Sequence, residues 1–382
     1  MTAVVAISSF LSERIAAGDF PSAVYLIAER GREVFVDALG NAVAEPEQIA
    51  ASLDTIYDLA SLTKPLATSM LCARRVEAGE LTLDSSVSHY LSEFSRSDKQ
   101  KITVQHLLTH SSGLPAWRPL YQLAGQTEQA LTAIADVELD YEPGTRVVYS
   151  DLGFIVLGLL LEKLSGKPLA ELAREEMFAP LNLQHTFFNP ELALQTGIAA
   201  CEMGNNYERQ MCGESDNDKK SWREEVIWGQ VHDGNAYFLG GAAGHAGLFS
   251  TARETFAIAS QFLGRHSKLL KPNTCDLFRT NLTNGLEEAR SFGWQLAETK
   301  DSAAGTDLPR NSFGHSGFTG TSCWIDPQHE RIFILLTNRT HARVLPFANI
   351  NSVRRRFHSL AAAALDAPTG RGSADEVSTT TR

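Results

Sequence analysis

The sequence lacks an excess of basic residues, and this absence excludes one large class of function. Its 34 lysine and arginine residues are outnumbered by 45 aspartate and glutamate residues, which gives a formal net charge of −11. A nucleic-acid-binding domain needs a basic patch that neutralises phosphates. We therefore predict no nucleic-acid partner, and the charge gives no help to binding at an anionic membrane surface.

Cysteine is also scarce. The chain has five cysteines, an odd number with no Cys-x-x-Cys pair: Cys72, Cys201, Cys212, Cys275 and Cys323. Neither a disulfide framework nor a zinc site is expected from this pattern. Free thiols in a reducing compartment are the interpretation that fits it.

Long apolar runs are missing as well. No stretch approaches the ~20 apolar residues that a membrane-spanning helix needs. The N-terminus has no basic start, and its short apolar run ends at Glu13 and Arg14, which makes a poor secretory signal. We therefore predict a cytoplasmic protein with no membrane span.

Three familiar site signatures are absent. There is no Gly-x-Ser-x-Gly of the kind that suits a Ser-His-Asp hydrolase, and no Gly-x-x-x-x-Gly-Lys phosphate loop. His106 and His110 have the i, i+4 spacing of metal ligands, but no glutamate lies between them in a His-Glu-x-x-His arrangement. We predict that His110 braces a loop, and we predict no metal and no cofactor.

The composition that remains is that of a globular protein, with 43% hydrophobic and 21% charged residues. A chain of 382 residues allows two or three domains, or one domain with a large insertion. Periodicity predicts strands at 22–28, 33–38, 56–59, 292–297, 312–315, 322–325 and 331–336. It predicts helices at 3–17, 61–78, 105–109, 153–165, 169–178 and 349–365, with long loops from 200 to 245.

This order of elements predicts an α+β fold in which an antiparallel sheet is flanked by helices. Residues 1–60 and 290–366 are expected to form a sheet region from both chain ends. Residues 61–289 form a mostly helical region with long site loops, and 367–382 form a disordered tail. The sequence carries no signal for a particular oligomeric state.

Ser61 and Lys64 form a Ser-x-x-Lys pattern at the start of the helix predicted over 61–78. Their i, i+3 spacing puts both side chains on one helix face. Serine needs an adjacent base, and lysine supplies one if burial or a second cation lowers its pKa from about 10.4 to ~7. Because a serine at this place is often only a helix cap, the catalytic hypothesis depends on partners.

Two further segments supply candidate partners. Tyr149 precedes an apolar helix, and a phenol close to a lysine can share the proton of that lysine. The alternative is that Tyr149 is a packed side chain and that Asp151 is the N-cap of the helix.

His315 to Gly317 lie on a predicted strand, where the glycine lets a substrate approach the backbone. The next amide, of Phe318, can then donate to an oxyanion, and the alternative is a β-bulge in an edge strand.

These segments carry a resemblance to a known family. In chain order the sequence reads DLASLTKP at 58–65, LLTHSSGLP at 107–115, YSDLGF at 149–154, GHAGLFSTA at 244–252 and HSGFTGT at 315–321. From about residue 20 to 340, the chain resembles the class C β-lactamase-related serine hydrolases. That group includes class C β-lactamases, DD-carboxypeptidases and family VIII carboxylesterases.

The resemblance implies a β-lactamase/transpeptidase-like fold with the site between the sheet and the helical region. It implies Ser61 as nucleophile, Lys64 and Tyr149 as the pair that handles protons, and an oxyanion hole made by the amides of Ser61 and Phe318. The remaining motif positions are expected to contact substrate: Asp151, His315, Ser316 and Gly317.

Two positions depart from the pattern of class C β-lactamases. Asp151 replaces an asparagine whose amide can donate to a substrate carbonyl, which an ionised aspartate cannot do. His315 replaces a lysine, and histidine is mostly neutral above pH ~6.5. Both changes weaken recognition of an anionic acylamino substrate.

We therefore predict a serine hydrolase that cleaves a small-molecule ester, amide or peptide through an acyl-enzyme on Ser61, and we favour a carboxylesterase. The alternatives are D-alanyl-D-alanine carboxypeptidase or β-lactamase activity, and a catalytically silent binding or scaffold protein of this fold. The loop from His232 to Asn235 is predicted to form a pocket wall. Trp228, Tyr237 and Phe318 are candidates for an apolar pocket, although aromatic residues are more often core.

Overall fold

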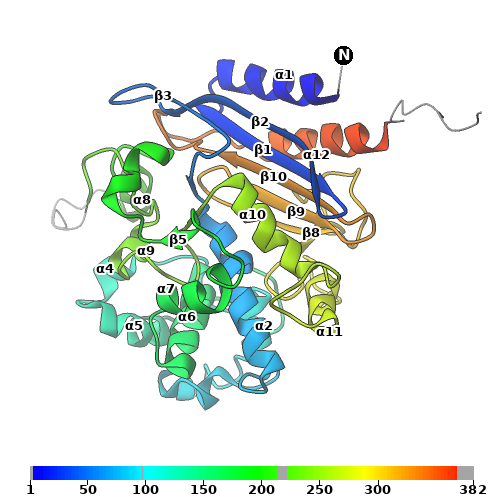
Figure 1. The fold of residues 1–382 in the computed structure, drawn as a ribbon. Helices are drawn as coiled ribbons and strands as arrows, with labels where there is room; N and C mark the ends of the chain where they lie inside the picture. Colours follow the sequence, from blue (N-terminus) through cyan, green and yellow to red (C-terminus); the bar gives the residue numbers. More distant parts are fainter. Residues whose placement is uncertain (1–2, 97, 214–221, 368–382) are drawn as a thin grey trace, which may run out of the picture.

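A seven-stranded antiparallel sheet organises the computed structural model, which describes residues 3–96, 98–213 and 222–367. The strand order is β3-β2-β1-β10-β9-β8-β7 (Figure 1). The strands are β1 (Ser22–Glu29), β2 (Arg32–Val43), β3 (Ile49–Ala50), β7 (Gln295–Leu296), β8 (Phe313–Ser316), β9 (Ser322–Asp326) and β10 (Arg331–Thr337). Because β1 pairs with β10, the two ends of the chain meet in the middle of the sheet.

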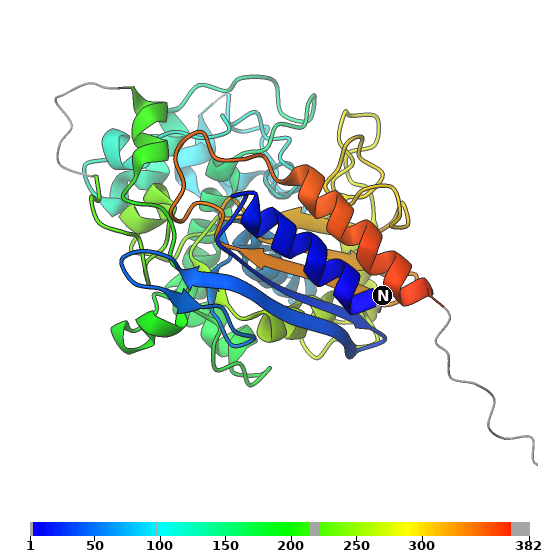
Figure 2. The same cartoon turned by 90° about the horizontal axis from the view of Figure 1, so that it is seen from above.

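The alternation of side chains along β1 explains the layers on the two faces of the sheet. Tyr25 and its alternate neighbours pack into a core with α1 (Ala3–Ala16) and α12 (Asn351–Asp366), which lie side by side over one face (Figure 2). Val24 and Leu26 belong to the larger core on the opposite face. Both faces of the sheet are therefore covered.

The larger core holds the helical region, and α6 (Asp151–Ser165) is its most apolar long helix. Gly166, at φ +67, ends this helix in the left-handed conformation that favours glycine. The other α-helices are α2 (Met70–Glu77), α3 (Val104–Leu108), α4 (Leu120–Leu123), α5 (Ala130–Asp136), α7 (Leu169–Ala173), α8 (Asn206–Cys212), α9 (Gly234–Phe238), α10 (Ala252–Ala259) and α11 (Pro272–Cys275).

A second, three-stranded sheet has the order β4-β6-β5. Its strands are β4 (Tyr57–Asp58), β5 (Phe187–Phe188) and β6 (Leu248–Ser250). The chain leaves β4 through a 3₁₀ turn, Ala60–Leu62, continues through a π-helical stretch, Lys64–Ser69, and enters α2. This small sheet thus fixes the start of the segment that carries Ser61.

The predicted fold class is confirmed, and most predicted elements are present within a few residues. The segment 200–245 differs, because it contains α8 and α9 where long loops were expected. These helices are short, seven and five residues, so their apolar period was too brief to recognise. The helix predicted from 153 begins at Asp151, and its N-cap is Ser150, whose Oγ accepts from Gly153 N at 3.3 Å.

Within the residues that the structure describes, no helix is long and apolar enough to cross a membrane. The tail predicted to be disordered falls almost entirely outside the described residues, since only position 367 of 367–382 is included. The division into a sheet region and a helical region stays a prediction.

Candidate active site

The turn after β4 presents Ser61 to a cavity. Ala60 adopts φ +48, a left-handed conformation that a non-glycine residue rarely takes. The Asp58 carboxylate holds this turn, since it accepts from Ala60 N at 2.8 Å and from His232 N at 2.7 Å. Strain of this kind is common where a fold must place a functional side chain.

Lys64 lies one turn after Ser61, and its side chain is fully buried. Its Nζ donates to Ser61 Oγ at 3.0 Å and to the His245 carbonyl at 3.0 Å, and it lies 2.7 Å from Asp151 Oδ1. Burial lowers the pKa of Lys64, but the charges and hydrogen bonds of Asp151 and Tyr149 outweigh it, so the net pKa is raised. The condition stated from the sequence, a lysine pKa lowered by burial or a second cation, is therefore not met at rest, because the neighbour is a carboxylate.

Tyr149 packs against Lys64, and the Lys64 Nζ lies 4.9 Å from the centre of the Tyr149 phenol ring. Its ring packs against His110, at 4.5 Å between centroids, and against His315, at 5.8 Å. Burial raises the pKa of Tyr149, and the Lys64 charge only partly opposes this. Tyr149 is therefore a neutral phenol in contact with an ammonium group.

Asp151 does not act as the N-cap of α6, the alternative raised for it from the sequence. Ser150 takes that position, and its backbone N–H donates to His110 Nδ1 at 3.0 Å. His110 thus has the bracing role predicted for it. His106 belongs to the capping box at the start of α3, where its Nδ1 accepts from Thr103 N at 3.2 Å.

The end of β8 forms the wall facing Ser61. A Cβ atom on Gly317 would lie 2.5 Å from the Leu59 carbonyl oxygen, so only glycine allows this approach. Thr319 Oγ1 donates to the Asp58 carbonyl at 2.8 Å, and Thr321 Oγ1 donates to the Leu59 carbonyl at 2.9 Å. These contacts tie the β8–β9 turn to the turn that carries the serine.

The two amides predicted to form the oxyanion hole lie on these tied turns. Neither Ser61 N nor Phe318 N donates a hydrogen bond to any residue that the structure describes. His315 is buried, and its Nδ1 lies 2.9 Å from the Ser316 carbonyl oxygen. Burial, followed by the charges of Lys64 and Arg290, holds the pKa of His315 well below its usual range, so this imidazole is neutral.

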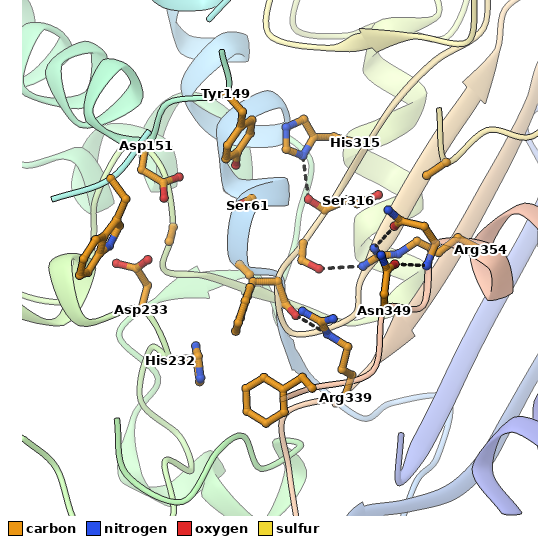
Figure 3. A pocket seen from close by; sticks show the side chains of 18 of the residues that line it. Ser61, Tyr149, Asp151, His232, Asp233, His315, Ser316, Arg339, Asn349 and Arg354 are labelled. Atoms are coloured by element: carbon orange, nitrogen blue, oxygen red, sulfur yellow. Dashed lines mark hydrogen bonds between the residues drawn. The ribbon is translucent and has the colours of Figure 1, made fainter. Parts of the chain in front are cut away.

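A cavity of about 600 Å³ opens over Ser61 and is lined by all but one of the predicted site residues, Lys64 being wholly buried beneath it. Figure 3 shows Tyr149 and His315 on one side of Ser61, with Asp151 and Asp233 together on another and Arg339 and Arg354 opposite them. Its wall thus has an acidic part and a basic part.

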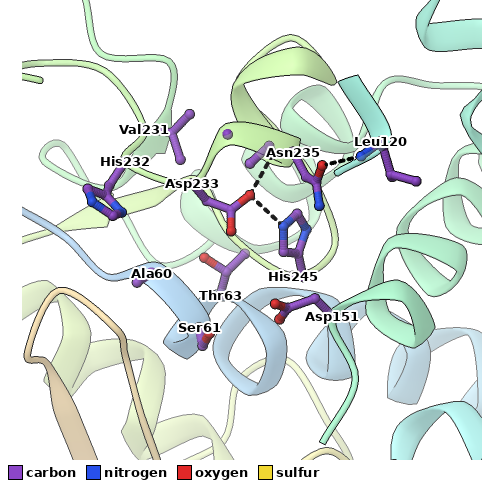
Figure 4. A network of polar contacts seen from close by, with 12 residues as sticks. Ala60, Ser61, Thr63, Leu120, Asp151, Val231, His232, Asp233, Asn235 and His245 are labelled. Atoms are coloured by element: carbon purple, nitrogen blue, oxygen red, sulfur yellow. Dashed lines mark hydrogen bonds and ion pairs between the residues drawn. The ribbon is translucent and has the colours of Figure 1, made fainter. Parts of the chain in front are cut away.

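The acidic wall consists of Asp233 and Glu208. Asp233 caps α9 by accepting from Ala236 N at 2.8 Å, and its Oδ1 lies 2.8 Å from His245 Nε2 (Figure 4). Burial raises the pKa of Asp233, but the His245 charge and the hydrogen bonds outweigh it and hold that pKa below its usual range. Glu208 accepts from Gly234 N at 2.7 Å, and burial beside Asp233 raises its pKa to about 7.

The basic wall consists of Arg339 and Arg354. Arg339 donates from Nε to the Phe318 carbonyl at 2.9 Å, and its guanidinium carbon lies 4.9 Å from the centre of the Phe318 ring. Arg354 donates from Nη2 to the carbonyls of Gly317 at 2.8 Å and Thr321 at 2.9 Å. Burial, together with Arg339, lowers the pKa of Arg354 to about 9. Among the described residues, neither arginine has a carboxylate within ion-pair distance.

The structure brings together Ser61, Lys64, Tyr149, Asp151 and the segment 315–318, and it places the predicted wall residues His232 and Asp233 beside them. Two predicted pocket residues lie elsewhere. Trp228 packs against a separate core cluster and donates from Nε1 to the Ile198 carbonyl at 2.8 Å. Tyr237 is 47% exposed and carries the Arg223 guanidinium on its ring.

Sequence reasoning missed the two arginines of the basic wall. Arg354 had a usable signal, because it lies beside Val353 on the face of α12 that is buried, where a charge needs a partner or a function. Arg339 had none, since it follows β10 in a loop with no recognisable motif. Both come to the site only through the tertiary fold.

The fold and the buried Ser-x-x-Lys site define a class, the serine hydrolases with a transpeptidase-like architecture. A sequence model described as "Beta-lactamase" matches residues 7–353. The chain therefore belongs to the beta-lactamase family, whose members are enzymes.

Curated relatives and solved structures agree with this assignment. The chain is 33% identical to an N-acetylmuramyl-L-alanine amidase of Bacillus subtilis (strain 168), over 87% of this chain and 80% of that protein. It is 31% identical to a putative D-alanyl-D-alanine carboxypeptidase of Escherichia coli (strain K12), over 88% and 82%. A class C beta-lactamase superposes with a TM-score of 0.72 at 18% identity, covering 97% of each chain. The hydrolase EstCE1 superposes with a TM-score of 0.71 at 23% identity, covering 95% and 98%.

Proposed function

We propose that Ser61 attacks an amide or ester bond that lies next to a carboxylate of the substrate, as in a peptide cleaved at its C-terminal residue. The observation that carries this proposal is the basic wall. A guanidinium without a counter-charge is costly when it is buried. Arg354 is buried and Arg339 is half-buried, and both line the same cavity as Ser61. A carboxylate in the substrate would supply the missing charge, with the planar, paired contacts that arginine favours.

The proposed chemistry is acyl transfer to Ser61 followed by hydrolysis. Ser61 Oγ bonds to the carbonyl carbon while its proton passes to the pair formed by Lys64 and Tyr149. The carbonyl oxygen takes the negative charge and accepts from the amides of Ser61 and Phe318. The same pair then protonates the leaving amine or alcohol, and water repeats the sequence to release the acid.

The other predicted site residues have supporting positions. Gly317 and Ser316 offer backbone along which an extended substrate can lie, and neutral His315 is a hydrogen-bonding group rather than a cation. Asp151 lies beside Lys64 and outside the acidic wall, and it can accept from a donor on the acyl side of the substrate.

The names of the relatives support an amide substrate. The two reported at 33% and 31% identity are named as an amidase and a putative D-alanyl-D-alanine carboxypeptidase. Peptides ending in D-alanyl-D-alanine carry the required carboxylate next to the scissile amide. We therefore place carboxypeptidase-like activity ahead of the carboxylesterase favoured from the sequence.

Carboxylesterase activity remains the second candidate, and His315 is the observation that favours it. A buried, neutral imidazole at this position gives no charge for a carboxylate to bind. A substrate whose leaving group is a neutral alcohol would then bind without any contact to Arg339 or Arg354.

The test compares a peptide ending in D-alanyl-D-alanine with the same peptide as its C-terminal amide, and with a short p-nitrophenyl ester. We expect the free acid to be cleaved at least about tenfold more efficiently than the amide, the equivalent of one charge-assisted contact. Ser61→Ala should lose at least about 1,000-fold in turnover and all labelling by a fluorophosphonate probe.

Ser92→Ala, at an exposed serine, is the matched control and should behave as the wild type. Equal cleavage of acid and amide, with faster cleavage of the ester, would establish the esterase instead. Turnover that survives in Ser61→Ala would end the assignment of the nucleophile. Absence of labelling in the native protein would favour the catalytically silent alternative.

A further inference from the structure

Asp151 is placed so that one carboxylate oxygen faces the ammonium of Lys64. Oδ1 lies 2.7 Å from Lys64 Nζ, the shortest of the three contacts that this nitrogen makes with Ser61, His245 and Asp151. The Asp151 backbone is itself fixed, because its N–H donates to the Ala116 carbonyl at 2.8 Å. The carboxylate is therefore held against the lysine from the first turn of α6.

The other ionisable groups around Lys64 lie just before α6 and on three further segments, and none of them supplies a free negative charge. They are Tyr149 before α6, Asp233 before α9, His110 after α3 and His315 on β8. Tyr149 is a neutral phenol, and burial keeps both histidines neutral. Asp233 already has His245 as its own partner at 2.8 Å. Asp151 thus supplies the one unshared negative charge that faces Lys64 within the described residues.

We propose that Asp151 is a positioning residue that acts through Lys64 and sets the pH at which Ser61 becomes a nucleophile. The proposal rests on the proposed role of Ser61. At rest the site holds an ammonium on Lys64, a carboxylate on Asp151 and a phenol on Tyr149. Before Ser61 can transfer its proton to the Lys64–Tyr149 pair, one proton must leave that pair to water.

The sign of the effect follows from this order of steps. A carboxylate beside Lys64 stabilises the ammonium, and it also disfavours a phenolate on Tyr149. Both effects raise the pH at which the pair loses its proton. An asparagine at 151 keeps the shape of the side chain and removes the charge, so the proton leaves at lower pH.

The experiment measures the second-order rate of Ser61 labelling by a fluorophosphonate probe between pH 5 and 10. In the wild type we expect the rate to rise with an inflection on the alkaline side of neutrality. In Asp151→Asn the inflection should fall by at least about one pH unit, so that labelling on the acidic limb becomes about tenfold faster. Asp54→Asn, at a side chain that is 86% exposed, removes the same charge elsewhere and should leave the inflection in place.

An inflection in Asp151→Asn that coincides with the wild type, or lies above it, would overturn the proposal while leaving Ser61 as the labelled nucleophile. Labelling that persists in Ser61→Ala would instead overturn the proposed function. If Asp151→Asn fails to fold, the pair Asp151→Glu and Asp151→Gln gives the same comparison. The glutamate variant should titrate close to the wild type, and the glutamine variant at least about one unit lower.

Discussion

The acidic and basic walls of the cavity differ in the partners that the protein itself supplies for their ionisable groups. Each acidic side chain is matched from within: Asp233 by a helix N-terminus and an imidazole, and Glu208 by a backbone amide and the Tyr121 hydroxyl at 2.9 Å. Arg339 and Arg354 are bound mainly to backbone carbonyl oxygens, and no carboxylate of the described chain lies within ion-pair distance of them.

This difference separates structural charges from charges left for a ligand. A buried charge that is fully hydrogen-bonded supports the fold, and changing it should act mainly on stability. A buried charge without a counter-ion keeps its capacity to bind one. The comparison therefore predicts that the acidic wall is structural and that the basic wall binds substrate.

The largest expected effect comes from Arg354→Gln. This change removes the donors to the carbonyls of Gly317 and Thr321 and frees the turn that carries the Phe318 amide. We expect kcat to fall about 100-fold, as for loss of an oxyanion donor, and the free energy of unfolding in urea to fall by about 3 kcal/mol. Arg356→Gln, at an exposed position of the same helix, is the control. A kcat in Arg354→Gln equal to that of the wild type would show that this arginine does not support catalysis.

The next effect concerns Glu208 and the pH dependence of stability. Its pKa is raised to about 7 in the folded protein, so folding favours the protonated form. The stability this contributes is fully present below the unfolded pKa of about 4.5 and is lost as pH rises through about 7. We measure the drop in the free energy of unfolding in urea between pH 5 and pH 8. In Glu208→Gln this drop should be smaller than in the wild type by roughly 2 kcal/mol.

Glu191→Gln, at an exposed glutamate, should keep the wild-type pH dependence. The preference for a free acid over an amide should also survive in Glu208→Gln, because the acidic wall is expected to be structural. A changed preference would contradict the contrast between the two walls.

The smallest effect is expected for Arg339→Gln. The KM for a peptide with a free carboxylate should rise about tenfold, while the KM for the matching amide stays unchanged. The control is Arg265→Gln, which alters an arginine that is 86% exposed and remote from the cavity lining. An equal rise in KM for acid and amide would mean that Arg339 only supports the Phe318 loop.

Much of the site was visible in the sequence, because its catalytic groups sit in short local patterns. Ser61 and Lys64 are three residues apart, Tyr149 stands directly before an apolar helix, and His315 and Gly317 share one strand. Local spacing fixes which face such groups occupy, so the cluster could be assembled from motifs. The apolar periodicity of the strands predicted that both ends of the chain contribute to one sheet.

What the sequence could not predict depends on pairings between distant segments. The sequence showed that Lys64 needs a lowered pKa to act as a base. It did not show the contact with Asp151, 87 positions further along the chain, which raises that pKa. The arginines were missed for the same reason. The short helices α8 and α9 were taken as loops because seven and five residues hold too few turns for a helical period.

The two bonds from Thr319 and Thr321 to the Asp58 and Leu59 carbonyls have a consequence for how this enzyme can diversify. They join segments 261 and 262 residues apart, and they fix the spacing between the serine turn and its facing strand independently of the chain between them. Insertions or exchanges in the loops of that intervening chain, away from Lys64 and Tyr149, can reshape the cavity while the spacing stays constant. Substrate choice and bond-breaking chemistry are therefore able to evolve separately in this fold.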